Sequence, residues 1–154
     1  MSITRQNPRT VMLACKGDPL IVDDLVASEA ITPGMLIETH LDSSDQKWRK
    51  NASATIVTEM AVALNRSMLN KGIDDAYAAA DLVEAWKLRT GDVFYGILPS
   101  GQDIVLGDYL QSNGDGKLKE AADGDATDNV ALFKALSSPG SVTADTRVIV
   151  ERIQ

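Results

Sequence analysis

Cysteine and histidine are nearly absent: the 154 residues contain one of each, Cys15 and His40. A single cysteine excludes an internal disulfide and is compatible with folding in a reducing cytosol. A single histidine excludes a metal site built from several histidines, and it leaves His40 as the only candidate for a histidine base. We expect Cys15 to be a half-buried apolar residue and His40 to lie on the surface at the end of a strand.

Aromatic side chains and positive charges are also scarce. Aromatic residues make up 5% of the chain, and 15 lysines and arginines stand against 22 aspartates and glutamates, which gives a net charge of −7. Nonspecific binding to nucleic acid needs basic side chains that displace counterions, so this balance argues against a nucleic-acid partner. We expect the scattered aromatic residues to belong to the core and to subunit contacts rather than to a sugar-stacking surface.

Long apolar runs are missing as well. No stretch approaches the roughly 18 apolar residues of a membrane span. The first ten residues, MSITRQNPRT, lack the apolar segment of a signal peptide. We therefore expect no membrane contact and synthesis in the cytoplasm.

The charge that is present is unevenly distributed. Residues 1–16 contain Arg5, Arg9 and Lys16 and no acidic residue, so this segment carries +3; since the whole chain carries −7, the remainder carries −10. A basic segment on an acidic body is able to reach an acidic neighbour. We name Arg5, Arg9 and Lys16 as candidate contact residues and expect residues 1–16 to serve attachment more than folding. A frayed terminus is the alternative.

Glycine and aspartate recur at short intervals between residues 70 and 118, with a few apolar residues between them. This rhythm is typical of short β-strands joined by tight turns. The length fits one compact domain. The prediction is a mainly β fold, a small barrel or sandwich, with residues 1–29 as an extended N-terminal arm and first strand and residues 30–154 as the β-barrel body.

The apolar pattern and the turn signals predict a series of strands, with hairpins that turn at residues 42–45 and 112–116. Residues 20–28 fit either a short helix or a strand, and helix competes with strand at residues 55–64. Residues 74–80 have helix propensity, but we predict an irregular loop there. The predicted strands are residues 10–14, 35–39, 47–52, 55–64, 82–88, 93–98, 104–111, 116–120, 129–136 and 146–153.

Two short segments of the chain resemble each other. Ile31–Ile37 (ITPGMLI) and Ile104–Leu110 (IVLGDYL) are each followed by a polar turn and a basic strand, and further on by a similar apolar strand. Two related β-lobes would explain this internal echo. Matches as short as these also arise by chance.

The sequence contains only weak matches to motifs for metal binding or catalysis. Asn113–Gly116 (NGDG) is superficially similar to a calcium loop, but Gln111 and Ala122 stand where an EF-hand needs ligands, so we predict a hairpin turn. The acidic pairs Asp23–Asp24 and Asp74–Asp75 have no recognisable partner and are expected to be exposed loop residues. The sequence predicts no catalytic residue, no cofactor and no metal site.

Several short sequence motifs between residues 33 and 150 resemble those of a known family. The phrases are Pro33–Glu38, Gly72–Asp81 with Val83, Gly91–Tyr95, Leu98–Gln102 with Ile104, Gly107–Asp108, Leu110–Leu118 and Thr146–Val150. In this order and spacing the chain resembles the head decoration (cement) proteins of tailed bacteriophages. Ala80 departs from the pattern, because such proteins often have glycine before the aspartate. The resemblance covers residues 30–154 and leaves residues 1–29 outside it.

The resemblance implies a non-enzymatic protein with a β-tulip-like fold and no cofactor. It implies a place on the outer surface of a phage head, where the protein binds the major capsid protein and bridges neighbouring subunits, as a homotrimer or sometimes a dimer. Packaged DNA pushes the shell outward, and many weak contacts add up through avidity. Two other functions remain open from the residues alone: a carbohydrate- or host-surface-binding β-barrel module, and a small hydrolase that uses a serine with His40.

Overall fold

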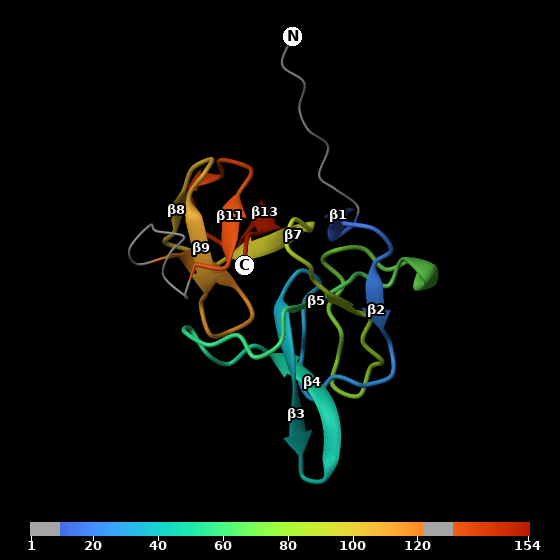
Figure 1. Cartoon of the computed structure of the whole chain (residues 1–154). Helices are drawn as coiled ribbons and strands as arrows, with labels where there is room; N and C mark the ends of the chain where they lie inside the picture. The colour runs from blue at the N-terminus through green and yellow to red at the C-terminus, as the bar shows by residue number, and fades with distance from the viewer. Residues whose placement is uncertain (1–9, 122–130) are drawn as a thin grey trace.

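The computed structural model describes residues 10–121 and 131–154, and these residues are built almost wholly of β-strands (Figure 1). The mainly β prediction is confirmed. One short 3-10 helix, η1 (Ser67–Leu69), is present in the described residues, where no helix is long and apolar enough to cross a membrane. The strands are β1 (Met12–Ala14), β2 (Leu20–Val22), β3 (Leu36–Asp42), β4 (Asp45–Lys50), β5 (Ala61–Ala63), β6 (Ala85–Lys87), β7 (Val93–Leu98), β8 (Asp103–Ile104), β9 (Tyr109–Ser112), β10 (Leu118–Glu120), β11 (Phe133–Ala135), β12 (Gly140–Ser141) and β13 (Thr146–Arg152).

The strands pair in two main antiparallel sheets. The larger sheet has the order β1-β7-β13-β11-β9-β10, and the smaller one has the order β2-β6-β5-β3-β4; β8 and β12 form a separate pair. Both main sheets keep two edge strands, so the described residues form no closed barrel, and the sandwich alternative is the one that fits. The body was predicted as a barrel or a sandwich because strand rhythm alone does not fix closure.

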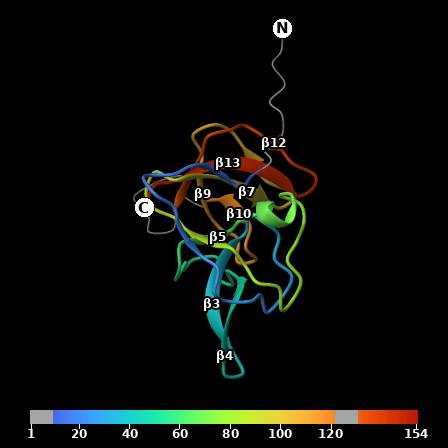
Figure 2. The ribbon, with the colours of Figure 1, turned by 90° about the vertical axis from the view of Figure 1, so that its right-hand side faces the viewer.

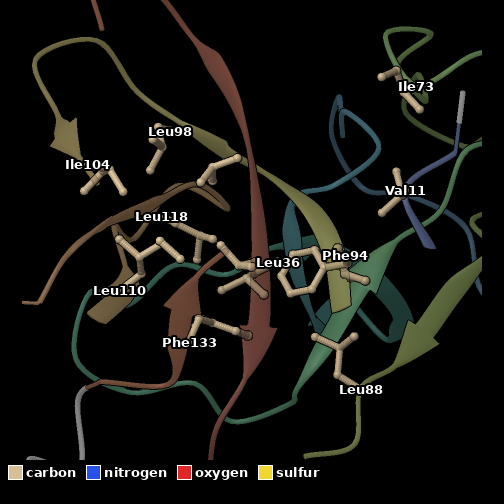
Figure 3. Close-up of a cluster of buried hydrophobic side chains, with 14 of the residues drawn as sticks. Val11, Leu36, Ile73, Leu88, Phe94, Leu98, Ile104, Leu110, Leu118 and Phe133 are labelled. Atoms are coloured by element: carbon tan, nitrogen blue, oxygen red, sulfur yellow. The ribbon is translucent and has the colours of Figure 1, made fainter. Parts of the chain in front are cut away.

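The main core lies between the two sheets (Figure 3). Leu36 and Trp86 enter it from the smaller sheet, and the rings of Phe94 and Phe133 meet edge to face across the larger sheet with centroids 5.5 Å apart. Burial of apolar surface from both sheets is the dominant stabilising contribution of such a sandwich. The fully buried apolar side chains of this core include Val11, Leu36, Val62, Trp86, Phe94, Leu98, Ile104, Leu110, Phe133, Val148 and Val150.

A second core covers the opposite face of the smaller sheet. Because side chains alternate along a strand, Leu36 enters the main core and Ile37 enters the second one; Trp86 and Ala85 divide in the same way. The irregular connections that cover this face are fixed by bridges such as the one between Ile31 and Tyr77. Because the centre of this sheet is buried on both faces, β5 and the first two residues of β3 are apolar at successive positions, whereas β4 is mainly polar.

Most of the predicted strands are confirmed. Both hairpins, β7 and β13 lie where the pattern placed them, and residues 74–80 are irregular. Val148 and Val150 are both 0% exposed, as the alternation of the last strand predicted.

The predicted strand at residues 55–64 is wrong for most of its length, since only β5 is a strand. The N–H groups of Thr55 and Ile56 bond to the hydroxyl of Ser53, at 3.2 and 3.0 Å, and therefore do not pair with another strand. Side-chain hydroxyl groups compete with the sheet for backbone donors in this way.

The bounds of several other predicted strands differ from those in the structure. The predicted strand 104–111 is divided into β8 and β9 by a turn at Gly107, and residues 20–28 contribute the short strand β2. Strand β11 covers part of the predicted strand 129–136. Residues 122–130, which include its start, lie outside the described residues.

The segment that leads into the sheets is part of the fold. Strand β1 lengthens the larger sheet beside β7, Val11 is 0% exposed, and its N–H donates to Oδ1 of Asn65 at 3.1 Å. The N–H of Lys16 donates to Oδ1 of Asp92 at 2.7 Å. The expectation that residues 1–16 contribute little to folding is therefore wrong for residues 10–16, because their partners lie far along the chain.

The internal echo corresponds to two lobes with the same topology. The order β6-β5-β3-β4 of the smaller sheet, here called lobe 1, repeats as β13-β11-β9-β10 in the larger sheet, here called lobe 2. The hydrogen bonds repeat as well: the Gly34 N–H donates to the Ala63 carbonyl at 2.7 Å, and the Gly107 N–H donates to the Ala135 carbonyl at 2.9 Å. Equivalent bonds at equivalent positions are the structural basis of the sequence echo.

Aspartates fix several turns at which a strand or bridge begins. In Ala80-Asp81, Gly91-Asp92 and Gly107-Asp108 the residue before the aspartate has φ of 72°, 93° and 95°. Each carboxylate accepts the N–H of the residue three positions earlier, at 2.9, 2.6 and 2.9 Å. The Gly-Asp phrases that carry the family resemblance therefore build turns. Ala80 takes the backbone conformation that glycine adopts at the other two positions.

Replacing Ala80 with glycine is expected to stabilise the protein by about 1 kcal/mol. A left-handed backbone costs an alanine roughly 1–2 kcal/mol, and the extra freedom of glycine in the unfolded chain offsets part of the gain. Urea unfolding measures the change. Ala79→Gly is the matched control, since Ala79 has no positive φ, and it should lower stability; a loss of stability for Ala80→Gly would contradict the strain argument.

Candidate functional site

The β3–β4 hairpin projects from the body of the molecule (Figures 1 and 2). Strand β3 pairs with β5 only at its first two residues, whereas its pairing with β4 continues to Asp42 and Asp45. The tight turn between them places Ser43 at φ 64°. Leu41, next to the tip, is 73% exposed. The hairpin therefore presents an apolar side chain near its tip to the surroundings.

Charged side chains cross-link the outer part of this hairpin. Nζ of Lys47 lies 2.8 Å from Oδ2 of Asp42, and His40 Nδ1 lies 3.3 Å from the Lys47 carbonyl. The hydrogen bond from Lys47, and then its positive charge, lower the pKa of Asp42; the same bond raises the pKa of Lys47. Water screens an exposed pair of this kind, so it orders the hairpin more than it stabilises the fold.

A buried polar network holds the base of the hairpin. Glu38 is 6% exposed, and its carboxylate accepts bonds from Arg49 Nε at 2.9 Å, Asn51 Nδ2 at 3.1 Å and Thr58 Oγ1 at 3.2 Å. The other end of the Asn51 amide accepts the hydroxyl of Ser112 from lobe 2 at 2.7 Å. A fully bonded network of this kind fixes one arrangement of the two lobes, since each group would be costly to leave without a partner.

Arg147 of β13 joins three segments that are distant in sequence. Its guanidinium donates to the carbonyl of Pro33 at 2.5 Å, to the carbonyl of Ile73 at 2.5 Å and to the carboxylate of Asp74 at 3.2 Å. The side chain is 15% exposed. Burial lowers the pKa of Arg147, and the hydrogen bond to Asp74 and its charge act against that shift. This cation therefore works as a clamp that secures the connections over lobe 1 to lobe 2.

An open groove of about 830 Å³ lies beside the clamp. Most of the residues that line it have polar side chains, and Arg147 already bonds to the carbonyl of Ile73 there. The described residues contain no group of three or more His, Cys, Asp or Glu side chains placed to hold a metal ion. The residues that line the groove are Asn65, Ser67, Asn70, Lys71, Gly72, Ile73, Asp74, Asp75, Tyr95, Asp145, Thr146 and Arg147.

Tyr77 anchors the connection between β5 and β6. Its hydroxyl donates to the Leu64 carbonyl at 2.5 Å and accepts the Glu84 N–H at 3.3 Å, and Arg66 lies over the ring at 4.5 Å from its centroid. Burial raises the pKa of Tyr77 to about 12. The residue is 0% exposed, so its role is structural.

Exposed apolar side chains are found at several places on the described surface. After Met68, the three most exposed are Leu41 on the hairpin at 73%, and Leu69 in η1 and Leu106 on a turn at 65% each. The aromatic side chains, in contrast, are buried or half-buried, as expected, so the described residues present no exposed aromatic platform. The exposed large apolar residues are Leu20, Ile21, Leu41, Ile56, Met68, Leu69, Leu82, Val105 and Leu106.

Of the three candidate basic residues, the structure describes only Lys16. Its side chain is exposed, next to the end of β1. Arg5 and Arg9 lie outside the described residues. The side chain of Lys16 is therefore accessible from the surface.

The other sequence motifs take structural roles. Asn113–Gly116 forms the β9–β10 turn, as predicted, and Asp23–Asp24 and Asp74–Asp75 are exposed. Cys15 is half-buried, with its thiol 3.0 Å from the Gly17 carbonyl, and His40 lies partly exposed near the end of β3.

Sequence reasoning missed the Arg147 clamp and the length of the projecting hairpin. The alternating pattern of the last strand located Arg147 on a face, but its carbonyl partners are at residues 33 and 73, which no local pattern connects to it. A clue to the hairpin was present: an apolar Leu41 stands beside the polar turn, where a hairpin tip is normally polar.

No protein-family model matches the chain, and no curated protein matches it by sequence. Among solved structures, the chain is similar to the N base of the head fiber protein gp8.5 of bacteriophage phi29, with a TM-score of 0.56 and 14% sequence identity. The similarity covers 88% of this chain and 99% of that structure. At this identity the comparison shows a shared fold.

Proposed function

We propose that this chain is a structural protein of a phage virion that sits on the outside of the head. The observation that carries the proposal is the fold shared with the base of a phage head fibre along nearly the whole length of both chains. The phrases that resemble head decoration proteins support the same assignment independently of that comparison. Together they support a head-associated protein, and we propose that it is made in the host cytoplasm.

The more specific part of the proposal is a cementing role. The protein binds the major capsid protein and bridges neighbouring subunits as a homotrimer, without catalysis and without a cofactor. A symmetric oligomer offers each surface several times, so weak contacts combine through avidity. The projecting β3–β4 hairpin and the basic residues near the N-terminus supply surfaces of the kind that such contacts need.

The direct test is co-sedimentation of the purified chain with phage heads that lack it. Binding is expected, and heads that carry the protein should survive heating and osmotic shock better than bare heads. Heads that bind the chain but gain no resistance would leave a head-associated protein without the cementing role. Failure to bind heads at all would overturn the assignment.

Reversing the basic charges near the N-terminus should weaken binding to heads in a salt-dependent way. Arg5→Glu with Arg9→Glu is expected to reduce affinity at least about tenfold at low salt and less at high salt, because screening weakens charge attraction; Lys16→Glu should act in the same direction. The matched control is Lys71→Glu with Lys87→Glu, which changes the charge equally elsewhere on the described surface. Equal binding by all variants would remove the basic segment from the contact.

A further inference from the structure

The β9–β10 turn contains Asn113, the only asparagine of the chain that is followed by a glycine. The backbone nitrogen of Gly114 is well placed in the chain to attack the side-chain carbonyl carbon of Asn113, because glycine has no Cβ to obstruct the approach. Such an attack forms a cyclic succinimide and expels ammonia, and water then opens the ring to aspartate or isoaspartate. The turn therefore contains the reacting groups of a spontaneous modification.

The structure engages both nitrogen atoms that take part in this reaction. The N–H of Gly114 donates to the hydroxyl oxygen of Ser112 at 3.1 Å, and Nδ2 of Asn113 donates to Oδ1 of Asp115 at 3.1 Å. The same carboxylate oxygen accepts the Lys117 N–H at 3.1 Å. An N–H that donates to a protein acceptor loses its proton to solvent more slowly than a free one, which is the basis of hydrogen-exchange protection. The attack needs the Gly114 nitrogen without its proton, so the same bond slows the modification.

The turn is also seated on lobe 1. The carbonyl of Gly116 accepts the Leu36 N–H at 2.8 Å, and the N–H of Gly116 donates to the Asn51 carbonyl at 3.2 Å. A Cβ on Gly114 would lie 3.3 Å from the backbone nitrogen of Ala54, so the loop after β4 lies directly against the reactive peptide. This loop therefore restricts rotation of the peptide in which the ring would form.

Ser112 connects the hydrogen bond inside the turn with the seating on lobe 1. Its side chain is buried, and its hydroxyl donates to Oδ1 of Asn51 in lobe 1 at 2.7 Å while it accepts the N–H of Gly114. A hydroxyl has one proton to donate, so the bond to Asn51 leaves its lone pairs for Gly114. Separation of the turn from lobe 1 would release this hydroxyl and the nitrogen that it protects.

We propose that Asn113 is a deamidation site whose reaction the fold suppresses, and that it reacts when the β9–β10 turn leaves lobe 1. The Gly114 nitrogen gives its proton to hydroxide and bonds to Cγ of Asn113, the bond from Cγ to Nδ2 breaks, and ammonia leaves; water then opens the succinimide. Both products place a new carboxylate beside that of Asp115, and isoaspartate also lengthens the backbone of the turn. The modified turn fits lobe 1 less well, so the reaction leaves a permanent record that the lobes had separated.

Mass spectrometry of the purified chain, incubated at mildly basic pH with and without an unfolding concentration of guanidinium chloride, measures the reaction. Trypsin releases residues 90–117, in which Asn113 is the only asparagine. Deamidation of this peptide should be at least about a hundredfold faster in the unfolded chain, because the native chain reacts only through a rarely populated open state. A synthetic peptide of residues 108–118 is the control for the effect of the denaturant and should react alike in both solutions. Equal rates in the native and the unfolded chain would overturn the proposal.

Ser112→Ala separates protection by the turn from the stability of the whole protein. The change removes the acceptor of the Gly114 N–H, and deamidation of the native chain should become at least about tenfold faster. The matched control is Ser137→Ala, because the Ser137 hydroxyl likewise accepts a backbone N–H, that of Ile149 at 3.0 Å, beside strand β13; it should produce no such acceleration. Equal acceleration in both variants would mean that global unfolding controls the reaction, and no acceleration in Ser112→Ala would mean that the hydroxyl gives no protection. Either result contradicts the proposal.

Hydrogen exchange of the unaltered chain, followed by NMR, tests the protection without a variant and decides the matter if Ser112→Ala does not fold. The N–H groups of Gly114 and Gly116 should exchange at least about a hundredfold more slowly than in an unstructured peptide. Exchange of the Gly114 N–H at the unprotected rate would overturn the proposal. These experiments use the free protein without phage heads, so their outcome is independent of the function proposed above.

Discussion

Gly34→Ala is expected to lower the free energy of unfolding by more than about 4 kcal/mol or to prevent folding. Gly34 has φ +94°, and a Cβ on it would lie 2.5 Å from the Tyr95 carbonyl oxygen and also overlap Nη1 of Arg147. Backbone and a clamped guanidinium cannot both move away without loss of the turn that begins β3. Strain together with a buried clash belongs to the small class of changes with effects this large.

Gly107→Ala is the matched control for this change. Gly107 occupies the equivalent turn of lobe 2 at φ +95°, and no atom lies within 4 Å of a Cβ on it. Only the strain of the backbone applies there, so the cost should be about 1–2 kcal/mol. Chemical unfolding of the two variants side by side measures the difference. Equal losses would show that crowding by Arg147 and Tyr95 does not matter.

Arg147→Ala is expected to destabilise the protein by about 3 kcal/mol or more. The guanidinium is mostly buried and bonds to the carbonyls of Pro33 and Ile73. Each carbonyl left without a partner costs roughly 1–3 kcal/mol, and the cavity left by the side chain adds to this. Urea unfolding followed by tryptophan fluorescence is a suitable measurement, since Trp48 and Trp86 are buried in the two cores.

Two further variants identify what the clamp depends on. Asp74 is 87% exposed, so Asp74→Asn should cost no more than about 1 kcal/mol, because a solvated ion pair contributes little. Arg147→Lys keeps the charge but loses the planar fork of donors, and it should recover only part of the stability. A large loss in Asp74→Asn with a small loss in Arg147→Lys would mean that charge, rather than the bonds to the carbonyls, holds the clamp.

The sequence predicted the turns more accurately than it predicted the long strand at residues 55–64. Turns such as Asn113–Gly116 were predictable because their residues bond to groups two or three positions away, as the Asp108 carboxylate does with the Val105 N–H. The strand at residues 55–64 was not predictable, since Ser53 withdraws two N–H groups that the pattern assigned to a sheet. A short apolar run favours a β-strand, and local hydrogen bonds from side chains decide whether the strand forms.

Surface residues also differ in how far the sequence predicts them. Lys16 was identified from its charge alone, and the structure leaves its side chain exposed. Leu41 and Leu106 carry no charge and no motif, and the same residue type is buried at Leu36 and Leu110. Exposure is a property of the folded surface, so an exposed leucine cannot be told from a core leucine by its identity.

By itself the sequence determined a mainly β body, the positions of most strands and turns, and an echo between its two halves. These features depend on alternation and on bonds between near neighbours in the chain. Only the tertiary structure decided that the sheets form an open sandwich, that residues 10–16 belong to it, that Arg147 clamps residues 33 and 73, and that one hairpin is seated while its equivalent projects. Each of these depends on groups that are distant in sequence, and their meeting is settled by the packing of the whole chain.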